Sequence, residues 1–367
     1  MGMRLGDNLR VTLFGESHGT CVGALVEGMP AGTEIDETEL SETILRRRPG
    51  RKGLSTRSES DDCEILSGVY EGRATGWPIL LLTRNSDVRS SDYSFLPDHP
   101  RPGHADMVED VRSDGANDPR GGGSQSARLT FGLVAAGSQV KALLDEADWS
   151  CSAHLHSVGE VRARPLFELD RDSRLDPSTD MGRLNCRDPE AAERMSEHLD
   201  FVRKDLDTIG SVVELLIEGL PMGVGEPWFD GIEPALARGL MAIPGARAVE
   251  FSSGVRASVM RGSEHNDAWL PGDLDPVPDG ADAAQADGAL GGRSTSAPIS
   301  VRIHFKPPSS LPREQFTLHL PSDEVRPLKV SGRHDPVIGP RAAPVVEAVA
   351  MLVLADLGML GGYIESD

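Results

Sequence analysis

The sequence predicts an α+β fold, and three observations lead to that class. Apolar runs typical of strands and amphipathic stretches typical of helices both occur along the chain. They do not alternate in the regular strand–helix rhythm of a doubly wound parallel sheet. One stretch, 299–306, alternates apolar and polar residues so strictly that it predicts a half-buried strand. Length alone, 367 residues, suggests about two domains.

The first half of the chain begins with a predicted strand at 10–14, followed by a predicted helix over 36–48. Asp36 and Glu39 have the spacing of a capping box, and the Pro-Gly pair at 49–50 ends the helix. The apolar runs 63–70 and 77–83 are further strand candidates. A polar, proline-rich stretch from 85 to 123 shows no periodicity. A loop of that length is typical of a functional or disordered segment.

The second half is predicted to hold three helices and two strands. The helices cover 126–147, 188–207 and 344–358, and the last two begin with a proline in the first turn, where a missing N–H is tolerated. The strands cover 211–221 and 298–307. Between them, the Asp-, Ala-, Gly- and Pro-rich stretch around 268–288 predicts a mobile acidic loop.

The charge balance disfavours a nucleic-acid partner. Acidic residues outnumber basic ones 58 to 37, the net charge is −21, and only five basic residues are lysines. Such a surface repels phosphate backbones. We hypothesise an adaptation to a salt-rich cytoplasm, against the alternative of a mildly acidic protein encoded by a GC-rich genome. Unfolding temperatures that do not change with added salt would exclude the adaptation.

The composition also bears on location and metal content. No apolar run approaches the ~18 residues that cross a membrane, and the first ten residues lack the apolar core of a signal peptide. We therefore expect a cytoplasmic protein without a membrane partner. Cys21, Cys63, Cys151 and Cys186 show no C-x-x-C spacing, so we expect free thiols and no metal site.

Five polar clusters are candidate functional sites. They are GESHG with Ser17 and His18, RRRPGRK with five cations at a helix end, RPGHAD with His104 and Asp106, DPRGGGSQSAR before a helix, and SGRHDP with Arg333, His334 and Asp335. Each alone is compatible with a turn, a helix-terminal charge, a hinge or a surface salt bridge. Read for function, guanidinium groups suit phosphate or carboxylate, and a glycine loop before a helix suits an anion.

The combination and order of these clusters resemble the chorismate synthase family. The motifs that carry the resemblance are FGESHG, RRRPG, ILSGVYEG, NSDVRSSDY, RPGHAD, RGGGSQSARLT, GVGEPWFDGIEPALARGLMAIPGARAVE, RGSEHND and GRHDPVIGPRAAPVVEAVAMLVLAD. They cover nearly the whole chain in the order of the family. The resemblance implies one domain over 1–367 with a β-α-β sandwich, assembled as a homotetramer.

The same resemblance implies a lyase of the shikimate pathway, at the last step shared by the aromatic amino acids. Phosphate leaves 5-enolpyruvylshikimate 3-phosphate by 1,4-anti elimination to give chorismate, and reduced FMN is required. A substrate with a phosphate and two carboxylates explains arginines concentrated within an acidic protein. The chain shows no added reductase domain, so the resemblance implies an external source of reduced flavin, with NADPH a candidate reductant.

Residue roles are also implied by the resemblance. His18 would be the acid for departing phosphate, His104 would protonate or stabilise the reduced flavin, and Asp335 would assist transfer of the substrate proton. Ser17 and Ser126 would relay protons. The implied flavin positions are Ser124, Gln125, Ser126, Pro244, Gly245, Gly291, Lys306, Pro307, Pro308, Ser309, Ser310 and Arg333. The implied substrate or NADP positions are Arg47, Arg48 and the pair Arg51 and Lys52, of which one matches the family.

Two departures from the family pattern concern the flavin. The usual RSSARET is SQSARLT here, so Ser124 replaces an arginine, and the segment before Ser294 gains Arg293. A shift of positive charge from position 124 to 293 is one interpretation. Two rival functions remain open at this stage. One is a metal-dependent phosphatase using His104, Asp106, His334 and Asp335, and the other is an FMN-binding module without turnover.

Overall fold

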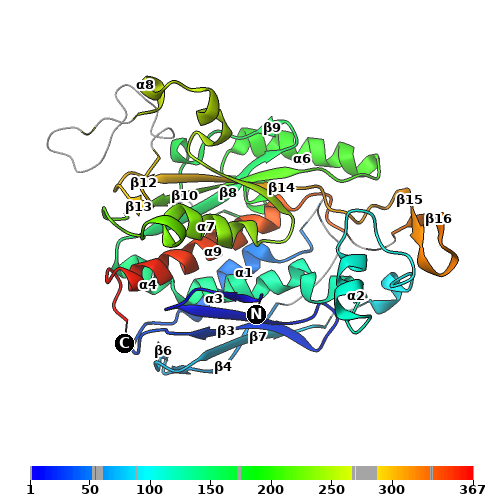
Figure 1. Ribbon diagram of the computed structural model, residues 1–367, viewed down its shortest axis with the longest axis horizontal. Helices are drawn as coiled ribbons and strands as arrows, with labels where there is room; N and C mark the ends of the chain where they lie inside the picture. Colours follow the sequence, from blue (N-terminus) through cyan, green and yellow to red (C-terminus); the bar gives the residue numbers. More distant parts are fainter. Residues whose placement is uncertain are drawn as a thin grey trace.

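The computed structural model describes residues 2–51, 54, 61–86, 89–171, 175–266, 269, 287–330, 332 and 334–366. Two antiparallel sheets enclose a layer of helices (Figure 1). The expected β-α-β sandwich is therefore confirmed. Lys52, Arg333 and nearly all of the predicted mobile loop 268–288 lie outside the described residues.

The first sheet has the strand order β1-β2-β3-β7-β4. Its strands are β1 (Arg4–Leu5), β2 (Arg10–Gly15), β3 (Cys21–Glu27), β7 (Ile79–Arg84) and β4 (Glu64–Ser67). The strands predicted at 10–14, 63–70 and 77–83 are confirmed, with the second of them divided between β4 and β5 (Val69–Tyr70). The sequence analysis missed β3, which pairs with β2 and β7 at the centre of this sheet.

The second sheet has the order β11-β14-β10-β8-β9. Its strands are β11 (Ala246–Phe251), β14 (Ile299–Phe305), β10 (Ser211–Glu218), β8 (Ser150–Val158) and β9 (Val161–Arg162). In β14 the apolar Ile299, Val301, Ile303 and Phe305 are buried while Arg302 and His304 are partly exposed, as the alternation predicted. One face of this sheet therefore packs on the helices, and the other carries polar side chains.

The helical layer consists of α1 (Glu37–Arg47), α3 (Thr130–Gln139), α7 (Ile232–Met241) and α9 (Gly339–Leu360). α3 packs on the first sheet, α9 packs on β8 and β10 of the second, and the two helices contact each other. One continuous apolar core results, with residues from both sheets and from these helices. α1 begins as predicted, because Asp36 accepts hydrogen bonds from the backbone N–H groups of Thr38 and Glu39.

α9 begins five residues before the predicted start and includes Pro344 in its interior. Proline lacks the N–H that would bond to the carbonyl of Pro340. Asn185 Nδ2 donates a hydrogen bond to the carbonyl of Pro340 instead, at 2.5 Å. This carbonyl therefore has a donor although the helix continues through Pro344. By length and composition α9 is apolar enough to cross a membrane, but 89% of its apolar window is buried between the sheets. We interpret it as the central core helix.

The stretch 85–123 differs from the prediction of a loop without secondary structure. It contains α2 (Asp106–Ser113) and short 3-10 turns at Ser90–Tyr93 and Arg120–Gln125. α2 has only 8 residues, so its helical periodicity is too short to be recognised in the sequence. The remaining elements are β5 (Val69–Tyr70), β6 (Arg73–Ala74), α4 (Lys141–Glu146), α5 (Asp180–Leu184), α6 (Pro189–Lys204), α8 (Gly262–His265), β12 (Ala289–Leu290), β13 (Arg293–Ser294), β15 (Glu314–His319) and β16 (Glu324–Lys329).

Candidate active site

A cavity of about 600 Å³ lies where the ends of several elements meet. Its walls come from the segments 103–105, 121–127, 242–247, 306–310 and 334–345. These are the loop before α2, the glycine segment before α3, the turn between α7 and β11, the end of β14 and the start of α9. Four of the five polar clusters found in the sequence therefore contribute to this cavity or lie against it.

A glycine segment places two of the predicted histidines on either side of it. A Cβ atom on Gly121 would lie 2.6 Å from the ring of His18 and 2.8 Å from Ser17 Oγ. A Cβ atom on Gly122 would lie 3.3 Å from Cε1 of His104. Both glycines have positive φ, +62° and +87°, which side chains rarely adopt. The sequence GGG is therefore required both for the backbone conformation and for close contact with the histidines.

His104 lies in the cavity wall and is held by a buried carboxylate. Its Nδ1 is 2.7 Å from Asp106 Oδ1, and Arg101 donates to both oxygens of the same carboxylate. Burial alone would raise the pKa of Asp106, but hydrogen bonds from Arg101 and His104 hold it well below its usual range. The ionised carboxylate keeps the proton of a neutral imidazole on Nδ1, so Nε2 is the nitrogen left for chemistry.

His18 is held by aromatic and hydroxyl neighbours. Its ring meets Tyr93 edge to face at 5.1 Å, and its Nδ1 lies 3.2 Å from Ser90 Oγ. The backbone N–H of Ser17 donates to the carbonyl of Gly123 at 3.0 Å, which joins the GESHG turn to the glycine segment. His18 and Ser17 do not line the cavity themselves but pack behind Gly121, which does.

Asp335 lies in the cavity wall near the start of α9. Arg341 NH1 donates to its Oδ2 at 2.8 Å. The other oxygen, Oδ1, is buried and has no hydrogen-bond partner among the described residues. A buried acceptor without a partner is uncommon in folded proteins, so this oxygen indicates a place where a bound molecule donates a hydrogen bond.

Cations concentrate at one end of the cavity. Lys306 Nζ donates to the carbonyl of Gly103 at 2.5 Å and to Ser309 Oγ at 2.8 Å, and Arg247 lies in the same wall. Burial and the charge of Arg247 lower the pKa of Lys306. Among the described residues, three cationic side chains and one carboxylate line the cavity of this strongly acidic protein. The cavity therefore favours anions.

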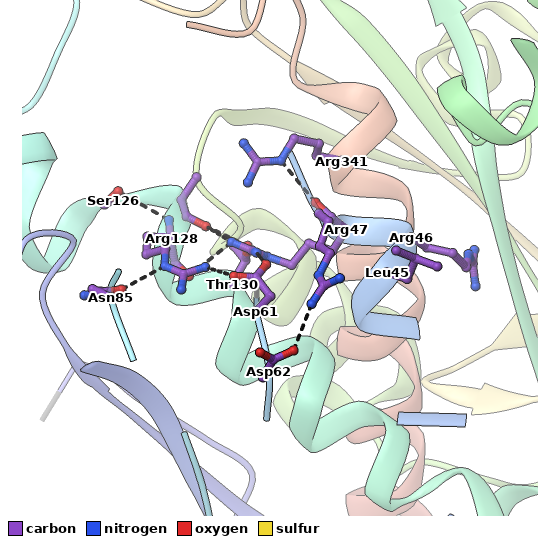
Figure 2. A network of polar contacts seen from close by, with 12 residues as sticks. Leu45, Arg46, Arg47, Asp61, Asp62, Asn85, Ser126, Arg128, Thr130 and Arg341 are labelled. Atoms are coloured by element: carbon purple, nitrogen blue, oxygen red, sulfur yellow. Dashed lines mark hydrogen bonds and ion pairs between the residues drawn. The ribbon is translucent and has the colours of Figure 1, made fainter. Parts of the chain in front are cut away.

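The arginines of the RRRPGRK cluster occupy a different position from the one the sequence analysis predicted. Arg47 is 1% exposed, and all three of its guanidinium nitrogens donate to the protein (Figure 2). Nε donates to Thr130 Oγ1, NH1 to Asp61, and NH2 to the carbonyls of Ala127 and Arg128. Arg128 also pairs with Asp61. The guanidinium of Arg47 is therefore fully engaged by protein groups, and its implied substrate or NADP role stays a prediction.

Arg51 is also engaged by the protein, because backbone carbonyls at two helix ends need donors. It donates to the carbonyls of Gly182, Arg183, Leu45 and Arg46. Burial, with the nearby charges of Arg46, Arg341 and Arg183, lowers its pKa to about 10. Arg48 pairs with the exposed Asp62 at 3.2 Å and does not line the cavity. The substrate or NADP role implied for Arg48 and Arg51 stays a prediction.

Most of the predicted flavin positions do come together. Gln125, Ser126, Pro244, Gly245, Lys306, Pro308, Ser309 and Ser310 line the cavity. Ser124 lines an adjoining cavity of about 340 Å³, which shares His104 and Gln125 with the first. Pro307 and Gly291 are not in the wall. Arg293 pairs with Glu226 at 3.1 Å on the exposed surface and does not line this cavity, so a shift of positive charge from position 124 to 293 stays a prediction.

The rival prediction of a metal centre was based on residues that the protein uses otherwise. Asp106 and Asp335 both pair with arginines, which disfavours a cation beside them. Among the described residues, one group could hold a metal ion, His154, His156 and Glu214 in the second sheet. There the backbone N–H of Arg187 donates to His154 Nδ1, so the ring carries its proton on Nε2 and donates it to Glu214.

Three contributors to the site were not singled out from the sequence. Arg101 positions Asp106, while Arg247 and Arg341 lie in the cavity wall. All three belong to motifs that the sequence analysis quoted, RPGHAD, IPGARAVE and GRHDPVIGPRAAP. The signal was therefore present, but nothing in the sequence showed which arginine of each motif faces inward.

Comparisons with known proteins agree with this geometry. The chain matches the family model described as chorismate synthase over residues 9–359. It is 46% identical to the chorismate synthase of Aeropyrum pernix, covering 97% of this chain and 92% of the relative. It is 41% identical to that of Methanosarcina mazei, covering 99% and 98%. A solved structure described as a crystal structure of chorismate synthase matches with a TM-score of 0.72 at 25% identity, covering 97% of this chain and 93% of that one.

Proposed function

The chain belongs to the chorismate synthase family, and we propose that its larger cavity binds reduced FMN beside the substrate. The enzyme is a lyase that eliminates phosphate from 5-enolpyruvylshikimate 3-phosphate to give chorismate. This is a step in the biosynthesis of aromatic amino acids. The observation that carries the placement is the convergence of His104, Asp335 and Lys306 on one cavity.

The residues of the cavity suit an anionic substrate. The substrate has a phosphate and two carboxylates, and Arg247, Lys306 and Arg341 supply three positive charges in the wall. Behind that wall, Arg47 and Arg128 both pair with the carboxylate of Asp61. Arg47 also donates to Ala127 and Thr130, which line the cavity. We propose that Arg47 contributes to substrate binding at this wall.

The described residues also fit FMN. A volume of about 600 Å³ is within the usual range for a cofactor site. Asp335 Oδ1 has no hydrogen-bond partner among the described residues and would suit a donor such as a flavin ring nitrogen. Lys306 and Arg247 suit its phosphate, and Gln125, Ser126, Ser309 and Ser310 offer hydrogen bonds along its length. Reduced FMN, when bound, supplies the electron density that assists departure of an allylic phosphate.

The protein's own part in the reaction is to position and move protons. His18, behind Gly121, would protonate the departing phosphate, with Ser17 beside it. His104, held by Asp106, presents Nε2 to the cavity, and Asp335 would assist transfer of the proton that leaves the substrate. Ser126, in the wall, would relay protons. The surrounding apolar side chains Ile243, Val337, Ile338 and Val345 limit access of water.

An anaerobic assay tests the proposal directly. Dithionite-reduced FMN and 5-enolpyruvylshikimate 3-phosphate are mixed with the protein, and chorismate is followed by its absorbance. We expect turnover only with the reduced flavin. Turnover without flavin, or flavin binding without turnover, would contradict the proposed use of this cavity. The second outcome would instead support the binding-module alternative.

A pair of variants tests the residue assignments. His18→Ala is expected to lower turnover by roughly 10²- to 10⁴-fold, the scale of a positioned proton donor, while flavin still binds. Arg48→Gln serves as the matched cation control, since Arg48 pairs with exposed Asp62 outside the cavity. We propose that Arg48 binds neither the substrate nor NADP, and that the Arg48→Gln variant keeps normal turnover and an unchanged Michaelis constant.

We propose further that the enzyme is a cytoplasmic homotetramer that receives reduced flavin from an external source, with NADPH as the candidate electron donor. Gly291 lies in the turn between β12 and β13, outside the cavity of its own chain. A role for Gly291 at the flavin therefore requires a neighbouring copy. Light scattering coupled to size exclusion measures the assembly, and a monomer with full activity would contradict this part.

A further inference from the structure

Arg341 makes two contacts that together determine where the Asp335 carboxylate lies. Its NH1 donates to Asp335 Oδ2 at 2.8 Å, and its Nε donates to the carbonyl of Arg47 at 3.2 Å. Figure 2 shows Arg341 beside Arg47, where α1 ends. A guanidinium is planar, so bonds at two of its nitrogens leave it little rotational freedom. The bond from NH1 therefore fixes the direction of the Asp335 carboxylate.

The contact leaves the two oxygens of Asp335 in different states. Oδ2 is bonded to Arg341, while Oδ1 has no hydrogen-bond partner among the described residues although it is buried. Both side chains line the larger cavity and are about one-fifth exposed, 19% for Arg341 and 18% for Asp335. One oxygen is thus held by Arg341, and the other accepts no hydrogen bond among the described residues.

The stability of α9 does not account for this arginine. Arg341 is the third residue of α9, and the start of a helix carries a partial positive charge. A cation there is unfavourable, and Arg341 also lies near enough to Arg51 to lower the pKa of that guanidinium. A position that is costly for the helix but bonded to a cavity carboxylate indicates a role at the site.

We propose that Arg341 is a positioning residue for the elimination, acting through Asp335. It holds Oδ2 so that Oδ1 is the oxygen directed to the reacting molecules. This inference rests on the proposed function, because it takes Asp335 as a group that assists transfer of the substrate proton. It assigns to Arg341 no direct contact with the substrate.

A double-mutant cycle tests the coupling. Arg341→Gln is expected to lower kcat about 10- to 100-fold, the usual effect of losing a partner that orients a reactive group, with the Michaelis constant changed less than about threefold. In the Asp335→Asn background the same substitution is expected to cost less than about threefold, because the group it orients is already lost. An equal loss in both backgrounds overturns the proposal, since Arg341 would then act on the substrate directly.

Two measurements separate positioning from folding. Guanidinium ion at millimolar concentration is expected to restore part of the activity of Arg341→Ala, and Arg341→Lys is expected to keep an intermediate kcat because lysine cannot make both bonds. A purely structural role predicts neither effect.

The equilibrium dissociation constant of oxidised FMN, measured without substrate, is expected to change less than about threefold in Arg341→Gln. Normal kcat in that variant, or loss of activity without rescue in Arg341→Ala, overturns the proposal.

The matched control is Arg171→Gln. Arg171 pairs with Glu218 at 3.0 Å, and their side chains are 28% and 30% exposed, similar to those of the Arg341–Asp335 pair. Neither residue lines the larger cavity. Its variant is expected to keep wild-type kcat. If Asp335→Asn keeps full turnover, the proposed role of Asp335 is wrong. If Asp335→Asn lowers turnover but Arg341→Gln does not, only the proposed role of Arg341 is wrong.

Discussion

Two histidine–carboxylate pairs in this molecule have the same chemistry but different surroundings. In the cavity, His104 Nδ1 lies 2.7 Å from Asp106, and the histidine is 25% exposed. In the second sheet, His154 Nε2 lies 3.3 Å from Glu214, and the histidine is 0% exposed. His104 keeps Nε2 for the cavity, whereas both ring nitrogens of His154 are bonded to protein.

The difference shows that a histidine beside a carboxylate is not by itself a catalytic feature. Glu214 also accepts a hydrogen bond from the backbone N–H of Leu166 at 2.7 Å, so this pair connects strands and a neighbouring turn. Asp106 instead connects His104 to Arg101, at the start of a short helix beside the cavity. A nitrogen that the protein leaves unbonded at a cavity wall distinguishes the two pairs.

The largest expected effect is on turnover, from His104→Ala. We expect a decrease of roughly 10²- to 10⁴-fold, because a positioned proton donor is removed, with little change in the unfolding midpoint. Steady-state kinetics with reduced FMN and urea unfolding measure the two quantities. If the His104→Ala variant unfolded at a lower urea concentration but turned over normally while folded, His104 would have a structural role like that of His154.

The next effect is on stability, from His154→Ala. We expect the free energy of unfolding to fall by about 2–4 kcal/mol, since a buried ring is lost and Glu214 loses a hydrogen-bond donor. Turnover per folded molecule is expected to stay within about twofold, because the pair lies on the polar face of the second sheet. A large loss of turnover at unchanged stability would reverse our assignment of the two pairs.

A smaller effect is expected from Asp106→Asn. The amide no longer holds the proton on Nδ1 of His104, and Arg101 loses its charged partner. We expect turnover to fall about 10- to 100-fold, less than for the loss of His104 itself. The comparison is made by measuring both variants under one set of conditions. An effect larger than that of His104→Ala would show that Asp106 acts directly on a bound molecule.

The smallest effect is a pH dependence of stability. Burial lowers the pKa of His154 despite its bond to Glu214, so the folded chain binds this proton less readily than the unfolded chain. The contribution of His154 is complete above the unfolded pKa near ~6.5 and is lost as the pH falls below it, by at most about 1.4 kcal/mol per pH unit. Urea unfolding at about pH 7.5 and about pH 5.5 measures it. His154→Gln is expected to remove this slope and His104→Gln to retain it, and equal slopes would contradict the assignment.

Much of the layered fold could be predicted from local patterns. Period-two alternation identified β14, the capping residue Asp36 identified α1, and a proline in the first turn identified α6, because these signals depend on neighbouring residues only. β3 and α2 were missed. β3 has four of its seven residues buried and none exposed, and it shows no alternation. α2 carries the apolar Met107, Val108 and Val111 at helical spacing, but its 8 residues are shorter than the window of about 11–18 residues in which helical periodicity is recognised.

The sequence by itself determined the family, the reaction and most of the residues that meet at the cavity, because those motifs are contiguous stretches. Only the tertiary structure decided which charged groups remain available there. Arg47 and Arg51 donate to groups brought close by α3 and α5, whereas Arg247 and Arg341 reach the cavity. A guanidinium bonds to whichever acceptors the fold places around it, and those acceptors come from segments far along the chain.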